Sequence, residues 1–103
     1  MQIFDLKSLL ESKDILGYIK AGADSDIYDP VAPVILEQLR TDLTLSQLQN
    51  IIWDAFYHEF CGGTIHDSKT PWMVDKTQAV NIIGYPEGFK SLATEIRLKF
   101  DKF

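Results

Sequence analysis

The sequence predicts a mainly α-helical fold: a compact single-domain bundle of four to five helices with one irregular loop at about 61–76. Three observations support this. Apolar residues recur at helical spacing in several stretches, and Gly and Pro separate these stretches from one another. The 103 residues, 46% of them hydrophobic, are enough for one core. No repeat or linker divides the chain, so residues 1–103 are expected to form one helical domain.

The first helical pattern begins at Leu6. Apolar residues recur after it at helical spacing as far as Ile19, which predicts a helix or a pair of helices broken near Ser12. Gly22 then supplies a stop signal. The polar stretch 23–30 predicts a loop, because its short polar side chains compete for backbone hydrogen bonds and its terminal proline removes a donor.

The second helix has two possible starting points. Asp29 can cap it, with Pro30 at the first helical position, or Pro33 can mark the true start, since a proline further inside would delete a helical bond. The buried face of this helix is expected to comprise Val34, Ile35, Leu36 and Leu39.

The clearest local signal is a capping box, in which Thr44 and Gln47 can each satisfy a free backbone N–H group of the other. It predicts a helix over Leu45–Phe60. Apolar residues cover more than one face of this segment, which predicts that it is the central helix. The glycines of Cys61-Gly62-Gly63 are expected to end it through a left-handed conformation.

The last third of the chain is less regular. Thr64–Lys76 has no clean period, and its Pro71–Val74 part is either an extended piece or an ordered loop. A short helix over Thr77–Ile83 closed by Gly84 is expected next, followed by turn chemistry at Tyr85–Gly88. The pattern then predicts a final helix to the end of the chain, with an apolar stripe of Phe89, Leu92, Ala93, Ile96, Phe100 and Phe103.

The composition argues against several classes of partner. A formal charge of −5 repels phosphate backbones and anionic lipids at long range, so neither nucleic acid nor membrane is expected as a partner. No run approaches the roughly 20 apolar residues that span a bilayer. The N-terminus lacks the pattern of a secretory signal, and a single cysteine agrees with a reducing compartment. A cytoplasmic protein is therefore expected.

The residue types that support catalysis or metal binding form one cluster. His58, Cys61, His66 and Asp67 are zinc-ligand types, but their spacing is irregular compared with known sites. Packing of Cys61 and solvation of His66 are the simpler interpretation. As a nucleophile, Cys61 would follow its helix, away from the N-terminal end that lowers a thiol pKa. We therefore expect no catalytic residue, no metal and no cofactor.

The charges are distributed unevenly along the chain. Residues 1–60 contain ten acidic and four basic residues, net −6, and residues 61–103 contain five and six, net +1. A solvated helix surface would explain this. The functional alternative is a partner-binding patch that offers carboxylates and a tyrosine ring to a basic protein; its residues would be Asp24, Asp26, Tyr28 and Asp29.

Two alternatives to this patch stay open. Tyr28 can instead be a core-facing ring that fixes the loop. If the patch is not the binding surface, Asp42, Asp54 and Glu59 form the next acidic group to test.

Two features resemble known families. The segment Asp24–Val31, followed by Val34–Leu36 and Leu48–Phe56, looks like an uncharacterised family of short bacterial helical proteins. A small acidic helical chain with DLKSLL near its start and EIRLKF near its end is similar to the immunity proteins of colicin and contact-dependent growth inhibition systems. That resemblance implies a partner: a secreted, basic nuclease toxin domain whose nucleic-acid site the acidic surface blocks. No family site residues carry over.

The expected function is therefore that of an immunity protein without enzymatic activity. It would bind and neutralise a cognate toxin, an RNase or tRNase domain, by occluding its active or substrate-binding site. The alternative is a non-enzymatic regulatory or structural protein-interaction module, antitoxin-like or phage-derived. A small enzyme that uses Cys61 is the third hypothesis.

Overall fold

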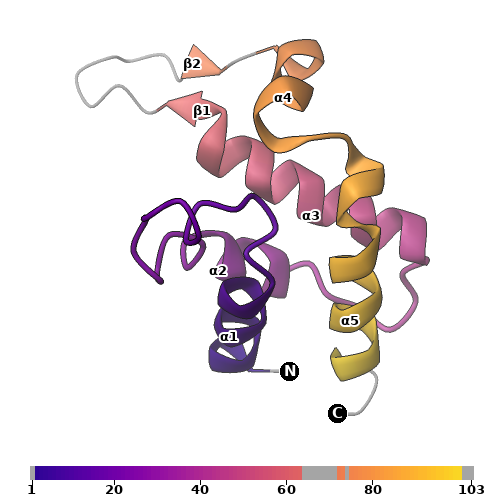
Figure 1. The fold of residues 1–103 in the computed structure, drawn as a ribbon. Coiled ribbons are helices and arrows are strands. Elements are labelled where there is room, and N and C mark those ends of the chain that lie inside the picture. Colours follow the sequence, from indigo (N-terminus) through magenta and orange to yellow (C-terminus); the bar gives the residue numbers. More distant parts are fainter. Residues whose placement is uncertain (1, 64–71, 74, 101–103) are drawn as a thin grey trace.

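The computed structural model describes residues 2–63, 72–73 and 75–100. Its fold is mainly α-helical, as the sequence predicts (Figure 1). In chain order the elements are α1 (Ile3–Lys13), α2 (Val31–Leu36), α3 (Leu45–Phe60), β1 (Gly62–Gly63), β2 (Trp72–Met73), α4 (Lys76–Ile83), the 3-10 helix η1 (Pro86–Phe89) and α5 (Lys90–Phe100).

The central helix is α3, and it has the predicted bounds. The capping box is present: the Gln47 backbone N–H donates to Thr44 Oγ1 at 3.1 Å, and the Thr44 N–H donates to Gln47 Oε1 at 2.9 Å. Helix α3 contacts α2, α4, α5, η1 and β1, and it passes through the middle of the molecule (Figure 1). Most of the other elements therefore pack on it, whereas α1 packs mainly against α2.

The predicted closure of α3 by a left-handed glycine is wrong. The cap residue is Cys61, which has a right-handed helical backbone (φ −117°, ψ −6°). Gly62 and Gly63 form β1, which pairs antiparallel with β2, Gly62 opposite Met73 and Gly63 opposite Trp72. Of the two alternatives for Pro71–Val74, the extended one is correct at Trp72–Met73. The remaining residues of the predicted irregular loop, 64–71 and 74, lie outside the described residues.

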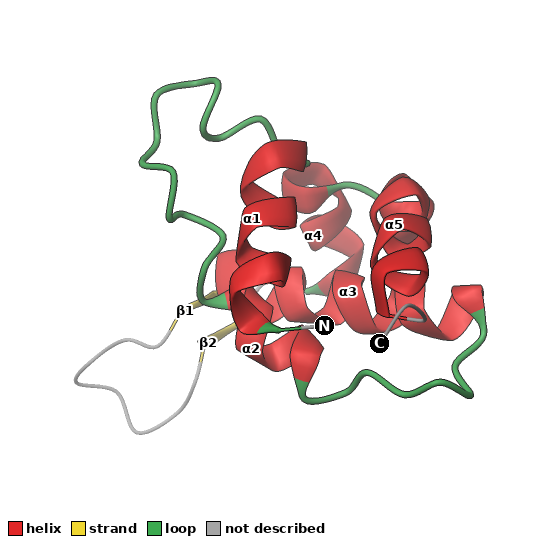
Figure 2. Ribbon diagram, turned by 90° about the horizontal axis from the view of Figure 1, so that it is seen from below, coloured by secondary structure: helices red, strands yellow, loops and turns green. Residues whose placement is uncertain are grey.

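The N-terminal segment agrees with its prediction in part. Helix α1 ends at Lys13, close to the predicted break near Ser12, but hydrogen-bonded turns follow it in place of a second helix. The break occurs because Asp14 adopts the left-handed conformation (φ 43°, ψ 53°), which short polar residues tolerate better than others. The long loop between α1 and α2 that results is drawn in green in Figure 2.

Helix α2 begins at Val31, so neither predicted start is correct. Pro30 is its N-cap, in the place expected for Asp29, and it makes no side-chain cap hydrogen bond. Pro33 is the third helical residue, where its missing N–H costs no bond because the first four N–H groups of a helix have no partner inside it. The buried face is shifted as well: Val31, Ala32 and Ile35 are buried, while Val34 is exposed and the other predicted residues, Leu36 and Leu39, are only partly buried.

The C-terminal elements follow the sequence closely. Helix α4 begins one residue early, at Lys76, because Asp75 caps it by accepting a hydrogen bond from the Thr77 N–H at 3.2 Å. Gly84 ends α4, as expected, and the predicted turn forms η1. The buried part of the final stripe comprises Phe89, Leu92, Ala93 and Ile96; Phe100 is partly buried and Phe103 lies outside the described residues.

Aromatic rings join the loop, α3 and η1 into one core. The Phe56 ring is fully buried, with its centroid 5.9 Å from that of Tyr28 and 5.0 Å from that of Phe89. The Phe60 ring lies 6.0 Å from Tyr28 and 5.4 Å from Tyr18. Of the helices that the structure describes, none combines the length and apolar character needed to cross a membrane.

Candidate functional site

The acidic loop, residues 15–30, is anchored by Tyr28. The Tyr28 side chain comes from the loop into the core, where it is 1% exposed against Phe56 and Phe60. The partner-contacting role expected for this ring is therefore incompatible with its position, and the core-facing alternative describes it. Burial of an aromatic ring stabilises the attachment of the loop to α3.

The Tyr28 hydroxyl completes this anchor with a hydrogen-bond network. It donates to Asp14 Oδ1 at 2.5 Å and accepts from the backbone N–H groups of Leu16 and Tyr18, both at 3.3 Å. The Asp14 carboxylate also accepts from the N–H groups of Ile19 at 3.1 Å and Lys20 at 2.9 Å. The first half of the loop is thus wrapped around one carboxylate and one hydroxyl.

The same network shifts the pKa values of both groups. The hydrogen bond from Tyr28, assisted by backbone N–H donors, lowers the pKa of Asp14 from its ordinary value. Burial, followed by the hydrogen bond to Asp14, raises the pKa of Tyr28 to about 12. Asp14 is therefore ionised and Tyr28 neutral at physiological pH, which is the combination that the hydrogen bond requires.

Sequence reasoning missed Asp14 as a structural centre. It lies inside the stretch for which the pattern predicts helix, and the three residues that donate hydrogen bonds to its carboxylate, Ile19, Lys20 and Tyr28, are up to 14 positions away in the chain. The available signal was weak: an Asp near the end of a helical pattern, followed by Gly17, is compatible with a left-handed helix end.

The three predicted aspartates lie on the outer part of this anchored loop. Asp24 and Asp26 are exposed, and among the described residues no cation lies within salt-bridge distance of either carboxylate. Asp29 is less exposed and faces α1, where its Oδ2 is 4.0 Å from Lys7 Nζ. Asp24 and Asp26 therefore carry the free charge of the loop.

The second acidic group is partly neutralised. Asp42 pairs with Arg40 at 3.3 Å, and Asp54 pairs with Lys76 at 3.6 Å. Glu59 is exposed, and no cation in the described part of the chain is placed to pair with it. Two of these three carboxylates are thus paired with a cation, whereas neither Asp24 nor Asp26 is paired with one in the described part of the chain.

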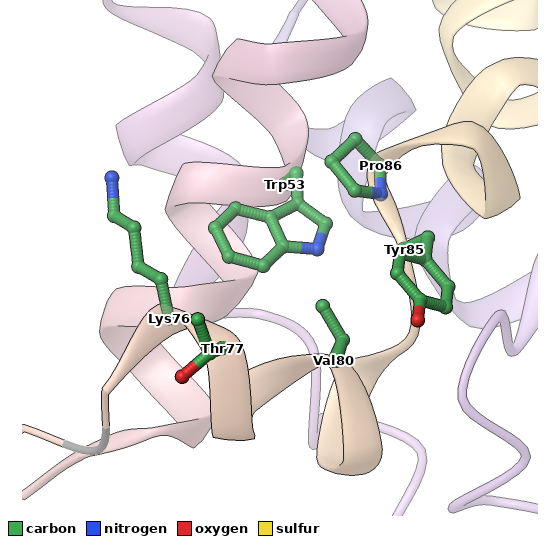
Figure 3. Close-up of a pocket in the computed structure, with 6 residues that line it drawn as sticks. All are labelled: Trp53, Lys76, Thr77, Val80, Tyr85 and Pro86. Atoms are coloured by element: carbon green, nitrogen blue, oxygen red, sulfur yellow. The ribbon is translucent and has the colours of Figure 1, made fainter.

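A second feature is an apolar groove of about 440 Å³ beside α3 (Figure 3). Its walls are Trp53 from α3, Lys76, Thr77 and Val80 from α4, and Tyr85 and Pro86 at the start of η1. The Trp53 indole N–H donates to the Gly84 carbonyl oxygen at 2.8 Å, which ties the end of α4 to α3. Tyr85 is 66% exposed and forms an outer wall. The groove brings together three segments that sequence reasoning treated separately.

Lys76 lies at one end of this groove. Its Nζ is 3.6 Å from Asp54 Oδ1, and it lies 6.0 Å and 5.6 Å from the ring centroids of Trp53 and Tyr57. These rings are themselves stacked, with centroids 5.4 Å apart. A carboxylate and two ring faces thus attract one cation at this end of the groove.

The residue types that could support metal binding or catalysis are not brought together in the described part of the chain. Cys61 is buried, and burial raises the pKa of its thiol. His58 is exposed, whereas His66 and Asp67 lie outside the described residues. Among residues 2–63, 72–73 and 75–100, no group of three or more His, Cys, Asp and Glu side chains is placed to hold a metal ion.

No protein-family model, curated protein or solved structure matches this chain.

Proposed function

We propose that this protein is a cytoplasmic immunity protein that binds and neutralises a cognate bacterial toxin and has no enzymatic activity. The toxin is a basic nuclease domain that acts on RNA or transfer RNA, and the protein occludes its active or substrate-binding site. One observation carries the proposal: Asp24 and Asp26 are exposed carboxylates without cation partners in the described residues, on a loop anchored by Tyr28 and Asp14.

The anchoring matters for binding because a loop that is already ordered loses less conformational entropy when a partner docks. The free carboxylates matter because opposite charge accelerates the encounter with a basic protein. Asp29 contributes less, since its charge is shared with Lys7. Tyr28 acts from inside the core and positions the loop without touching the partner.

The second candidate function is a non-enzymatic regulatory or structural protein-interaction module. The apolar groove favours this candidate. Its lining is mostly nonpolar and the Tyr85 side chain beside it is exposed, so it could contact a partner without help from the acidic loop. A gene neighbourhood without a toxin would support this candidate over the first.

The test begins with the product of the gene next to the one that encodes this protein. We expect the two proteins to purify together, and we expect this chain to protect cells that express the toxin. Absence of both effects would contradict the immunity proposal.

The role of the loop is tested with the double variant Asp24→Lys and Asp26→Lys. We expect association with the toxin to slow by on the order of tenfold at low salt, and the difference to shrink as salt screens the charges over about 8 Å at physiological ionic strength. The matched control is Glu11→Lys with Glu37→Lys, which changes the net charge equally at exposed positions elsewhere. Equal slowing in both variants would show that net charge, and not the loop, drives association.

A further inference from the structure

The groove described above is a nonpolar site whose polar neighbours are already engaged. The Trp53 indole N–H is bonded to Gly84, and the Lys76 ammonium is paired with Asp54. Of the described side chains that line the groove, only Thr77 and Tyr85 carry other polar atoms, both hydroxyls. An occupant therefore finds apolar surface and few hydrogen-bond partners, which favours a nonpolar side chain over a polar ligand.

The charges around the groove indicate which residues should lie next to that side chain in the bound segment. Asp54, Asp75 and Glu87 each adjoin a lining residue in the sequence and are exposed, whereas Lys76 is the one cation among the lining residues and their sequence neighbours. The Asp54 carboxylate pairs with Lys76, and Asp75, which caps α4, directly precedes Lys76 in the chain. Among these described side chains, three carboxylates therefore stand against one ammonium group. The excess negative charge fits a second cation, supplied from outside.

Lys76 itself shows how a cation is held at this end. Its ammonium group lies beside Asp54 and over the stacked rings of Trp53 and Tyr57. A guanidinium group favours the same surroundings, because it pairs with carboxylates and stacks on aromatic faces.

We infer that the groove binds a short basic segment of a protein partner, which inserts one aromatic or long aliphatic side chain beside Trp53 and Val80 and places an adjacent arginine or lysine near Asp54 and Asp75. The groove volume of about 440 Å³ lies within the roughly 300–1,000 Å³ range of ligand pockets, so the groove has room for one large side chain. This site goes beyond the proposed function and does not depend on it, because neither the toxin nor the acidic loop enters the inference.

Three tripeptide amides serve as probes: acetyl-Arg-Phe-Arg, acetyl-Arg-Ala-Arg and acetyl-Glu-Phe-Glu. The readout is the indole N–H signal of Trp53 in ¹H–¹⁵N NMR spectra, with a Trp72→Phe protein to assign it. We expect the first peptide to shift this signal saturably. The second should bind on the order of tenfold more weakly, since it lacks the buried ring. The third should bind more weakly than the first at low salt and approach it at high salt.

Variants locate the site. Val80→Phe fills the groove from α4, where Val80 points between Trp53 and Tyr85 (Figure 3), and should abolish the shifts. Tyr85→Ala removes a wall that is 66% exposed, so it should weaken binding without unfolding the protein. Its matched control is Phe4→Ala, which removes an exposed ring (73% exposed) on α1 and should leave binding unchanged. Asp54→Asn with Asp75→Asn should remove the preference for the basic peptide, since Asn keeps the cap of α4.

Two results would overturn the inference. One is an equal response to the Phe and Ala peptides, which would leave no role for the nonpolar side chain. The other is a set of shifts confined to the acidic loop around Asp24 and Asp26, unaffected by Tyr85→Ala, which would show that the peptide binds by charge alone. Neither result bears on whether a toxin purifies with the chain, so this inference and the immunity proposal fail separately.

Discussion

The hydroxyl of Tyr28 donates a 2.5 Å hydrogen bond to Asp14 across 14 positions of the chain. Asp14 ends α1, and Tyr28 precedes α2 by three residues. Because the same hydroxyl and carboxylate also receive four backbone N–H groups, this one pair fixes the path of the loop that carries Asp24 and Asp26. Loss of the pair should therefore affect both stability and binding.

Replacing Tyr28 by Phe tests the pair directly. The ring stays, but Asp14 loses a donor, and the N–H groups of Leu16 and Tyr18 lose their acceptor. We expect the free energy of unfolding to fall by about 1–3 kcal/mol, measured by urea denaturation. A control is Tyr85→Phe, which removes a hydroxyl from an exposed side chain and should change stability by less than about 0.5 kcal/mol. Unchanged unfolding of Tyr28→Phe would contradict the anchoring role.

The pH dependence of that difference has a definite sign. The Tyr28 pKa is about 12 in the folded protein, against an ordinary value of 10.0. Its contribution to stability is therefore complete below pH 10 and is lost as the pH rises towards 12. For Asp14, whose pKa is lowered from 3.8, the contribution is present above that value and is lost as the pH falls further. Denaturation of wild type and Tyr28→Phe should accordingly converge above pH 10, and a constant difference up to pH 12 would refute the link.

Gly84 should be intolerant of substitution although its surroundings are empty. Its backbone (φ 84°, ψ 178°) belongs to a region that is essentially reserved for glycine, and a Cβ there would meet no atom within 4 Å. We expect Gly84→Ala to cost about 1–3 kcal/mol through backbone strain alone. Gly88→Ala, at an equally open position without positive φ, should be neutral or stabilising by up to about 1 kcal/mol. Thermal melts of the two variants would separate strain from steric contact.

Phe56 should be a major determinant of core stability. Its ring is fully buried and touches rings from the loop and from η1. We expect Phe56→Ala to lower the free energy of unfolding by about 3–5 kcal/mol. Asn50→Ala, at an exposed position of the same helix, should change it by less than about 0.5 kcal/mol. Similar melting of the two variants would show that α3 is peripheral.

Cys61 should be unreactive in the folded protein. Its side chain is buried, and burial raises its thiol pKa, so little thiolate is present at neutral pH. Titration with an aromatic disulfide reagent at pH 7 should proceed much more slowly than in guanidinium chloride, where the same single thiol is exposed. A fast reaction in the native state would revive the hypothesis of a cysteine nucleophile.

The elements with local signals were predictable from the amino-acid sequence. The helix Leu45–Phe60 has its predicted bounds because Thr44 and Gln47 cap it through groups only three residues apart. The end of α4 at Gly84 is similarly local, because the required backbone conformation excludes other residue types. The apolar stripe of α5 was predictable from spacing, since its burial needs only one face against α3.

The role of Tyr28, the importance of Asp14 and the existence of the groove depend on packing between distant segments and could not be predicted from local sequence signals. A tyrosine among aspartates is compatible with a surface or a core position, and the choice depended on the space beside Phe56 and Phe60. The groove unites Trp53 with Val80 and Tyr85, residues more than 25 positions apart in the chain. No periodicity within a single segment encodes such contacts, because they arise where separate elements pack against one another.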